Sequence, residues 1–257
     1  MTGDFTLTWV TGLFGLVVGS FLNVCAFRLP VGESVVRPGS RCRRCGHELS
    51  WYENIPVLSY LVLRGRCRQC GVHISPQYPL VELATAIVFA AAAWRFGVSW
   101  LLAARLLLGA SLITLFVIDL EHRILPNVIT LPGIVTGFLF SLIAEPGWVS
   151  SAIGILAGGG VLYAVAEGYY LVRHEQGLGM GDVKMLAMIG AFLGWQLMLL
   201  TLVLSSFLGA IVGVGLIVLH RGNMKYALPF GSFLTVGALI AMFAGNEIIA
   251  WYFSFYR

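Results

Sequence analysis

The chain alternates between long apolar runs and short polar stretches. A helix that crosses a membrane needs about 20 predominantly apolar residues, and the pattern predicts about eight such helices. They are expected at Phe5–Ala26, Tyr78–Trp94, Trp100–Ile118, Val128–Ala144, Val149–Val172, Val183–Gly194, Gln196–Leu219 and Pro229–Tyr252. The run Val183–Gly194 is short, so the region from Val183 to Leu219 could divide differently or contain a broken helix.

Composition narrows the class of protein. Of the 257 residues, 58% are hydrophobic and 11% are charged, whereas a soluble domain carries about 25% charged residues. The mean hydropathy is +0.88. These values exclude a soluble enzyme, a disordered chain and a nucleic-acid-binding protein, despite the net charge of +4. The sequence therefore predicts an all-α polytopic membrane protein, whose partner is the lipid bilayer and not nucleic acid.

The basic residues predict the orientation in the membrane. Half of the 16 Lys and Arg residues fall in one polar insertion, between Arg28 and Arg68. With the N-terminus outside, 13 basic residues fall in inner segments and two in outer segments, which is a strong positive-inside bias. We therefore expect both termini outside the cytosol and the insertion inside it. The predicted division is a first transmembrane helix at 1–27, a cytosolic domain at 28–77 and a transmembrane domain at 78–257.

Four of the five cysteines form two C-x2-C knuckles in the insertion. The sequence reads Cys42-Arg43-Arg44-Cys45-Gly46 and Cys67-Arg68-Gln69-Cys70-Gly71, with 21 residues between Cys45 and Cys67. This spacing is typical of a four-thiolate zinc site of ribbon type. Free thiols, a redox pair or disulfides are the alternatives, although structural disulfides are rare in the cytosol. Four protein ligands leave no place for a water, so the predicted zinc is structural. Two nearby residues could replace a ligand or be solvated: His47 and His73.

Asp119 and Asp182 are the candidate catalytic residues. Asp119 closes the third predicted span, and Asp182 opens the sixth after the glycine-rich segment Gly177–Gly181. The 62 residues between them hold two predicted spans, one out and one back, so both carboxyl groups return to the same membrane face. Two adjacent carboxyl groups share one proton, which lets one activate a water while the other polarises a peptide carbonyl. The alternative is that each aspartate caps a helix.

Several motifs together resemble the type IV prepilin peptidases, a family of membrane aspartic proteases with a G-x-G-D motif. That motif is Gly179-Met180-Gly181-Asp182, and the first aspartate lies in a similar neighbourhood, Ile118–Pro126. The insertion resembles the four-cysteine domain of the family. The other similar segments are Gly19–Val24, Arg28–Pro30, Glu53–Pro56, Tyr78–Glu82 and Leu228–Gly231. The similarity covers nearly the whole chain.

The resemblance implies a multi-pass endopeptidase of the bacterial inner membrane. Such an enzyme removes the basic leader from type IV prepilins and related pseudopilins at the cytosolic membrane face, with Asp119 and Asp182 as its catalytic pair. Family members with the four-cysteine domain are often bifunctional and also N-methylate the new N-terminus with S-adenosylmethionine. No glycine-rich nucleotide motif follows a strand in this sequence, so the methyl-donor site is not identified. The candidates near it are Asn23, Glu53, Asn54 and Gly65.

Two other functions are compatible with parts of the pattern. A non-enzymatic membrane scaffold would dock a cytosolic partner on its zinc ribbon and use the aspartates as helix caps. A proton-coupled transporter would use the aspartates as a relay. Transporters place acidic residues near mid-membrane and often contain repeated halves, whereas these aspartates lie at span ends and no repeat is visible.

Overall fold

The computed structural model describes residues 4–174, 179–220 and 229–255, and within them it is helical. Two isolated β-bridges, Arg41 to Glu48 and Arg66 to His73, are the extended pairings in this part of the chain. This confirms the all-α class predicted from the apolar runs. The chain forms two compact units, Met1–Thr114 and Leu115–Arg257, and helix α4 (Trp100–His122) runs from the first into the second. The predicted division at residues 27 and 77 stays a prediction.

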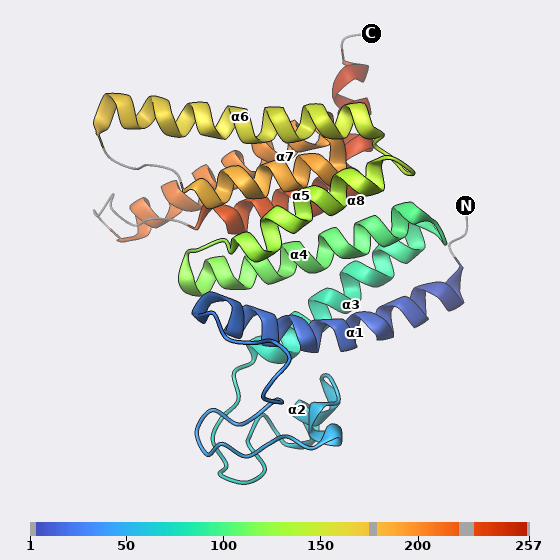
Figure 1. Cartoon of the computed structure of the whole chain (residues 1–257), viewed down its shortest axis with the longest axis vertical. Helices are drawn as coiled ribbons and strands as arrows, with labels where there is room; N and C mark the ends of the chain where they lie inside the picture. The colour runs from blue at the N-terminus through green and yellow to red at the C-terminus, as the bar shows by residue number, and fades with distance from the viewer. Residues whose placement is uncertain (1–3, 175–178, 221–228, 256–257) are drawn as a thin grey trace. The chain divides into compact units, whose positions relative to one another are not determined.

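In the first unit, α1 (Phe5–Arg28) and α3 (Gln77–Phe96) pack side by side (Figure 1). Glycines make this contact close: a Cβ on Gly15 would lie 2.8 Å from Cα of Ala86, and one on Gly19 would lie 2.7 Å from Cα of Glu82. Small residues allow such backbone approach between helices in lipid, where packing replaces the hydrophobic effect as the source of association.

The insertion between α1 and α3 contains three short helical segments. They are η1 (Leu29–Val31), η2 (Trp51–Asn54) and α2 (Leu58–Val62). The rest is loop, so this region buries little apolar surface of its own. A polypeptide of this size and composition depends on a metal ion or on its neighbours for a fixed structure.

In the second unit, the central helix is α7 (Met180–His220), which packs against α5 (Asn127–Ser141), α6 (Trp148–Arg173) and α8 (Phe230–Ser254) (Figure 1). The contact of α6 with α7 is the closest, because Gly154 and Gly190 meet backbone to backbone. The hydroxyl of Ser151 donates to the carbonyl of Ala191 at 2.8 Å. This satisfies a buried polar group inside the helix pair.

The predicted spans correspond to helices, with two differences: one helix is shorter than a membrane span, and two predicted spans belong to one helix. Six described helices are long and apolar enough to cross a membrane, namely α1, α3, α4, α6, α7 and α8, whereas α5 is shorter. The sixth and seventh predicted spans are consecutive parts of α7, which breaks at Gly194, where φ is 79°. Glycine adopts this left-handed backbone at no steric cost, so the helix changes direction there. The basic residues Arg221, Lys225 and Arg257 lie outside the described residues.

Candidate active site and metal centre

Asp119 lies in the last turn of α4, and its carboxylate sits at the N-terminus of α8. Its Oδ2 accepts two hydrogen bonds from Ser232, from the backbone N–H at 2.7 Å and from the hydroxyl at 2.9 Å. The side chain is buried, with 5% of its surface exposed. The first N–H groups of a helix have no partner within that helix, and its N-terminus favours negative charge. The predicted cap is therefore partly correct, because Asp119 caps a helix other than its own.

Asp182 lies in the first turn of α7 and is half-buried. Its backbone N–H donates to the carbonyl of Gly179 at 3.1 Å. Asp182 therefore lies within the turn that starts α7 and is not the residue that caps this helix. The carboxyl groups of Asp182 and Asp119 interact electrostatically. The structure thus brings together the two aspartates that the sequence separates by 62 residues.

Leu125 joins the two aspartate neighbourhoods. A Cβ on Gly181, next to Asp182, would lie 2.9 Å from Cβ of Leu125. A Cβ on Gly231 would lie 3.0 Å from both Oδ2 of Asp119 and Cδ1 of Leu125. The missing side chains of both glycines therefore leave room for the side chain of Leu125. Gly181, the second glycine of the G-x-G-D motif, thus allows close packing next to Asp182. Of the other motif residues, Gly177, Leu178 and Leu228 lie outside the described residues.

Two residues beside the aspartates, Ser232 and Leu125, were not singled out by the sequence analysis. Ser232 directly follows Leu228–Gly231, a segment that the sequence analysis noted as similar to the family. That similarity could have pointed to Ser232. The ammonium group of Lys184 donates to the side-chain oxygen of Asn127 at 2.9 Å and so ties the first turns of α7 and α5 together. Leu125 lay within the noted neighbourhood of Asp119, but its contacts with two glycines cannot be deduced from spacing.

The four predicted cysteine ligands converge in the first unit. The sulfur atoms of Cys42, Cys45, Cys67 and Cys70 all lie within 4.8 Å of one another. The pairs Cys42–Cys70 and Cys45–Cys67 are 3.8 and 4.0 Å apart. In a regular tetrahedral site with Zn–S bonds of about 2.3 Å, the sulfurs are about 3.8 Å apart. The cluster therefore fits a four-coordinate metal such as zinc.

The two knuckles have the same backbone construction. The N–H of Gly46 donates to the carbonyl of Cys42, and the N–H of Gly71 donates to that of Cys67, both at 2.9 Å. Both glycines have left-handed φ angles, 73° and 69°, which other residues adopt at a cost. Each turn aims two sulfurs at one point. A β-bridge closes each knuckle behind the turn.

The local backbone also acts on the acidity of the thiols. The pKa of Cys42 is lowered to about 6, because backbone N–H groups of Cys45 and Arg44 donate to its sulfur. A backbone N–H of His47 likewise favours the thiolate of Cys45, but reduced solvation and the neighbouring sulfurs together raise the pKa of Cys45 to about 11. A cation shared by all four sulfurs would stabilise every thiolate, since a metal binds the deprotonated form.

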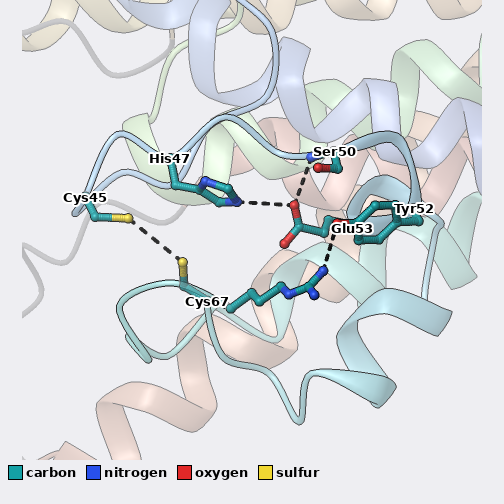
Figure 2. Close-up of polar contacts among 7 residues, drawn as sticks. Cys45, His47, Ser50, Tyr52, Glu53 and Cys67 are labelled. Carbon is teal, nitrogen blue, oxygen red and sulfur yellow. Dashed lines mark hydrogen bonds and ion pairs between the residues drawn. The ribbon is translucent and has the colours of Figure 1, made fainter.

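Figure 2 shows that the side chain of His47 turns toward Glu53, while Cys45 and Cys67 point toward each other. Glu53 is buried, and its Oε2 accepts from the backbone N–H of Ser50 at 2.8 Å and lies 3.3 Å from Nε2 of His47. The hydrogen bond from Ser50 and the contact with His47 lower the pKa of Glu53. His47 therefore braces the first knuckle through Glu53, and it does not belong to the sulfur cluster.

The four candidates for a methyl-donor site make contacts of their own or are exposed, and their role stays a prediction. Glu53 is engaged by His47 and Ser50, and the ring of Tyr60 fills the space beside Gly65. Asn23 is buried in α1, and its side-chain N–H groups donate to the carbonyls of Gly19 and Tyr78. The remaining candidate, Asn54, is exposed at the end of η2. No described residue is therefore assigned to the methyl donor.

The model of the bacterial peptidase A24 N-terminal domain matches residues 13–96, and that of the type IV leader peptidase family matches residues 106–214. A prepilin leader peptidase/N-methyltransferase of Pseudomonas aeruginosa is 39% identical, over 95% of this chain and 93% of the relative. One of Aeromonas hydrophila is 40% identical, over 93% and 91%. One of Myxococcus xanthus is 46% identical, over 79% and 61%. No solved structure matches the chain.

Proposed function

The chain belongs to the type IV leader peptidase family, and we propose that Asp119 and Asp182 are the residues with which it cuts its substrates. Its activities are those that its relatives are named for, prepilin leader cleavage and N-methylation. It is a bifunctional membrane aspartic endopeptidase and methyltransferase, and prepilins and the related pseudopilins are its proposed substrates. The observation that carries the catalytic proposal is that the two carboxyl groups interact, while the glycines beside them, Gly181 and Gly231, both pack against Leu125.

The two carboxyl groups act as base and acid. Ser232 occupies Oδ2 of Asp119 with two hydrogen bonds, so Oδ1 of Asp119 takes the proton of the attacking water. The water oxygen bonds to the scissile carbonyl carbon, while protonated Asp182 donates its proton to the carbonyl oxygen. When the C–N bond breaks, the proton held by Asp119 passes to the leaving nitrogen, and a hydroxyl of the tetrahedral intermediate returns a proton to Asp182 as the leader carboxylate forms. The products are the carboxylate of the leader and the free amine of the mature pilin.

The proposed membrane arrangement follows from the helices and the basic residues. The chain is a multi-pass protein of the inner membrane, with six described helices long enough to cross it. The positive-inside bias supports an N-terminus and a C-terminus outside the cytosol, with the insertion inside. Asp119 and Asp182 then lie at the cytosolic face, where the basic leader of a prepilin is accessible. The hydrophobic helix that follows the leader reaches them from the bilayer.

The four-cysteine cluster is the proposed site of a structural zinc ion. Cys42, Cys45, Cys67 and Cys70 would supply all four ligands, which leaves no coordination position for a reacting water. Zinc would therefore fold the insertion and take no part in peptide cleavage. For the second activity we propose S-adenosylmethionine as methyl donor, because transfer to an amine requires an electrophilic methyl group and the relatives are named N-methyltransferases.

One assay tests the catalytic proposal against the scaffold alternative. Detergent-solubilised protein is incubated with a purified prepilin, and loss of the leader is followed by mass spectrometry. The wild type should release the leader, whereas Asp119→Asn and Asp182→Asn should reduce the rate by at least about 100-fold, since asparagine cannot take up a proton from water. The matched control is Asp4→Asn at the third aspartate, which caps α1. Cleavage by either dyad variant at the wild-type rate would remove that residue from the mechanism.

A further inference from the structure

The insertion carries an apolar face that is exposed where a soluble domain would bury it. In α2, the side chains of Leu58, Leu61 and Val62 are 60%, 64% and 78% exposed. Their spacing of i, i+3 and i+4 places them on one side of the helix. A soluble protein turns such a side toward its core. Here Tyr60 faces inward instead, with its hydroxyl donating to the carbonyl of Ile74 at 3.4 Å.

Segment η2 adds an exposed aromatic side chain next to α2. It contacts α2, and its first residue, Trp51, is 80% exposed. Tryptophan is enriched where membrane meets water, because its ring is apolar and its N–H needs a polar partner. We name the surface formed by Trp51, Leu58, Leu61 and Val62 the η2–α2 face. It combines a tryptophan with aliphatic residues, which is the composition of helices that lie in a membrane interface.

A hydrogen bond fixes the level of this face relative to α3. The backbone N–H of Val57, the residue before α2, donates to Oε2 of Glu82 at 2.8 Å. Glu82 lies in the second turn of α3, a helix long and apolar enough to cross the membrane. The start of α2 is therefore held beside the second turn of α3.

The charges next to the face match the headgroups of an anionic leaflet. Arg64 and Arg66 follow α2 directly, and both are exposed. The insertion carries eight of the 16 basic residues of the chain. Arginine side chains reach from an apolar surface to lipid phosphates, and each basic residue near an anionic surface contributes to attraction.

We propose that the η2–α2 face is a membrane anchor, which inserts into the inner leaflet while Arg64 and Arg66 bind the phosphates of anionic lipids. The occupant of this face is the bilayer in which the chain already resides. The insertion then lies on the membrane surface and is not suspended in the cytosol. This arrangement keeps the four-cysteine cluster close to the cytosolic membrane surface, where the helix of a mature pilin leaves the bilayer. The inference rests on the proposed orientation of the spans.

Photo-crosslinking in nanodiscs tests the anchor with the full chain. Leu61 is replaced by p-benzoylphenylalanine, and the control carries the same residue in place of Glu48, which is also exposed in the insertion. The nanodiscs contain phosphatidylethanolamine with phosphatidylglycerol. After irradiation, mass spectrometry counts lipid adducts and adducts to an added prepilin. We expect several-fold more lipid adducts at position 61 than at position 48. Equal yields, or adducts at 61 that form with prepilin in place of lipid, would overturn the proposal.

A second variant tests the role of the arginines. Arg64→Gln/Arg66→Gln is made in the chain that carries the photo-reactive residue at position 61, and phosphatidylcholine replaces the anionic lipid in a parallel sample. The proposal requires the lipid adducts to fall in the variant only when anionic lipid is present. An equal fall in both lipids would contradict phosphate binding. Leader cleavage is measured in every sample, so that failure of the anchor is distinguished from failure of the peptidase assignment.

Discussion

Ser232 donates its backbone N–H and its hydroxyl to the same oxygen of Asp119, at 2.7 and 2.9 Å. The N–H belongs to the first turn of α8, so the end of α4 is held by the start of a helix that lies more than 100 residues later in the chain. This double contact fixes the direction of the Asp119 carboxylate. It also makes α8 part of the proposed active site, although α8 supplies no acidic residue near the two aspartates.

The first prediction is that Ser232→Ala slows leader cleavage about 10- to 100-fold. The variant keeps the backbone donor and loses the hydroxyl donor, and one hydrogen bond to a charged group contributes about 1.5–3 kcal/mol. The measurement is the single-turnover rate of leader release. Ser254→Ala is the matched control, because that hydroxyl lies at the exposed end of the same helix and bonds only to a nearby carbonyl. An unchanged rate in Ser232→Ala would show that the backbone N–H alone positions Asp119.

The second prediction concerns the packing around Leu125. Gly181→Ala should reduce cleavage by at least about tenfold, because its Cβ would lie 2.9 Å from Cβ of Leu125, closer than packed carbon atoms approach. A second change, Leu125→Ala, removes the end of the side chain and should restore part of the lost rate. The double-mutant cycle then gives a coupling between the two positions.

Gly160→Ala is the control for this pair. Gly160 lies in α6, where an added Cβ would meet nothing within 4 Å, so alanine should be tolerated or slightly stabilising. If Gly181→Ala is as active as Gly160→Ala, the glycine before Asp182 is not needed for close packing. Additive effects of Gly181→Ala and Leu125→Ala would likewise contradict direct contact.

The sequence predicted the helices because lipid imposes a simple rule. A chain in a bilayer must satisfy its backbone groups within each segment, so every apolar run of sufficient length becomes a helix. The four cysteines were equally predictable, since a tetrahedral metal site requires a spacing that sequence displays directly. The two aspartates were singled out as candidates because an acidic residue at the end of an apolar run is costly and therefore uncommon.

The contacts that complete the site were not predictable in the same way. Ser232 is one of many hydroxyl residues in the helices, and only the fold shows that its N–H faces Asp119 across the start of α8. The division at Gly194 was predicted, because one expected span ends there, but hydropathy did not show whether the two spans are separate helices or one broken helix. The exposed side of α2 is similarly hidden, since leucine and valine in a short run usually indicate a core.

The third prediction concerns the substrate. Replacing the glycine before the scissile bond of a prepilin with valine should lower the cleavage rate by at least about tenfold, a barrier increase of about 1.4 kcal/mol. A helical peptide bond offers no room for attack, so the site must unwind, and glycine is the residue with the largest backbone freedom. A glycine-to-alanine substrate should show an intermediate rate. Equal rates for all three substrates, measured by mass spectrometry, would contradict local unwinding as a step of substrate capture.

The fourth prediction is that loss of the four-cysteine cluster separates the two activities. Cys67→Ser/Cys70→Ser should lose the metal, about one zinc per chain in the wild type, together with most of its N-methylation. Leader cleavage should persist, because Asp119 and Asp182 belong to the other compact unit and a saturated four-thiolate ion cannot activate water. Cys25→Ser is the control, since this cysteine lies in α1 outside the cluster. Metal content and both activities are measured on the same preparations, and equal loss of cleavage and methylation would mean that the dyad depends on the folded insertion.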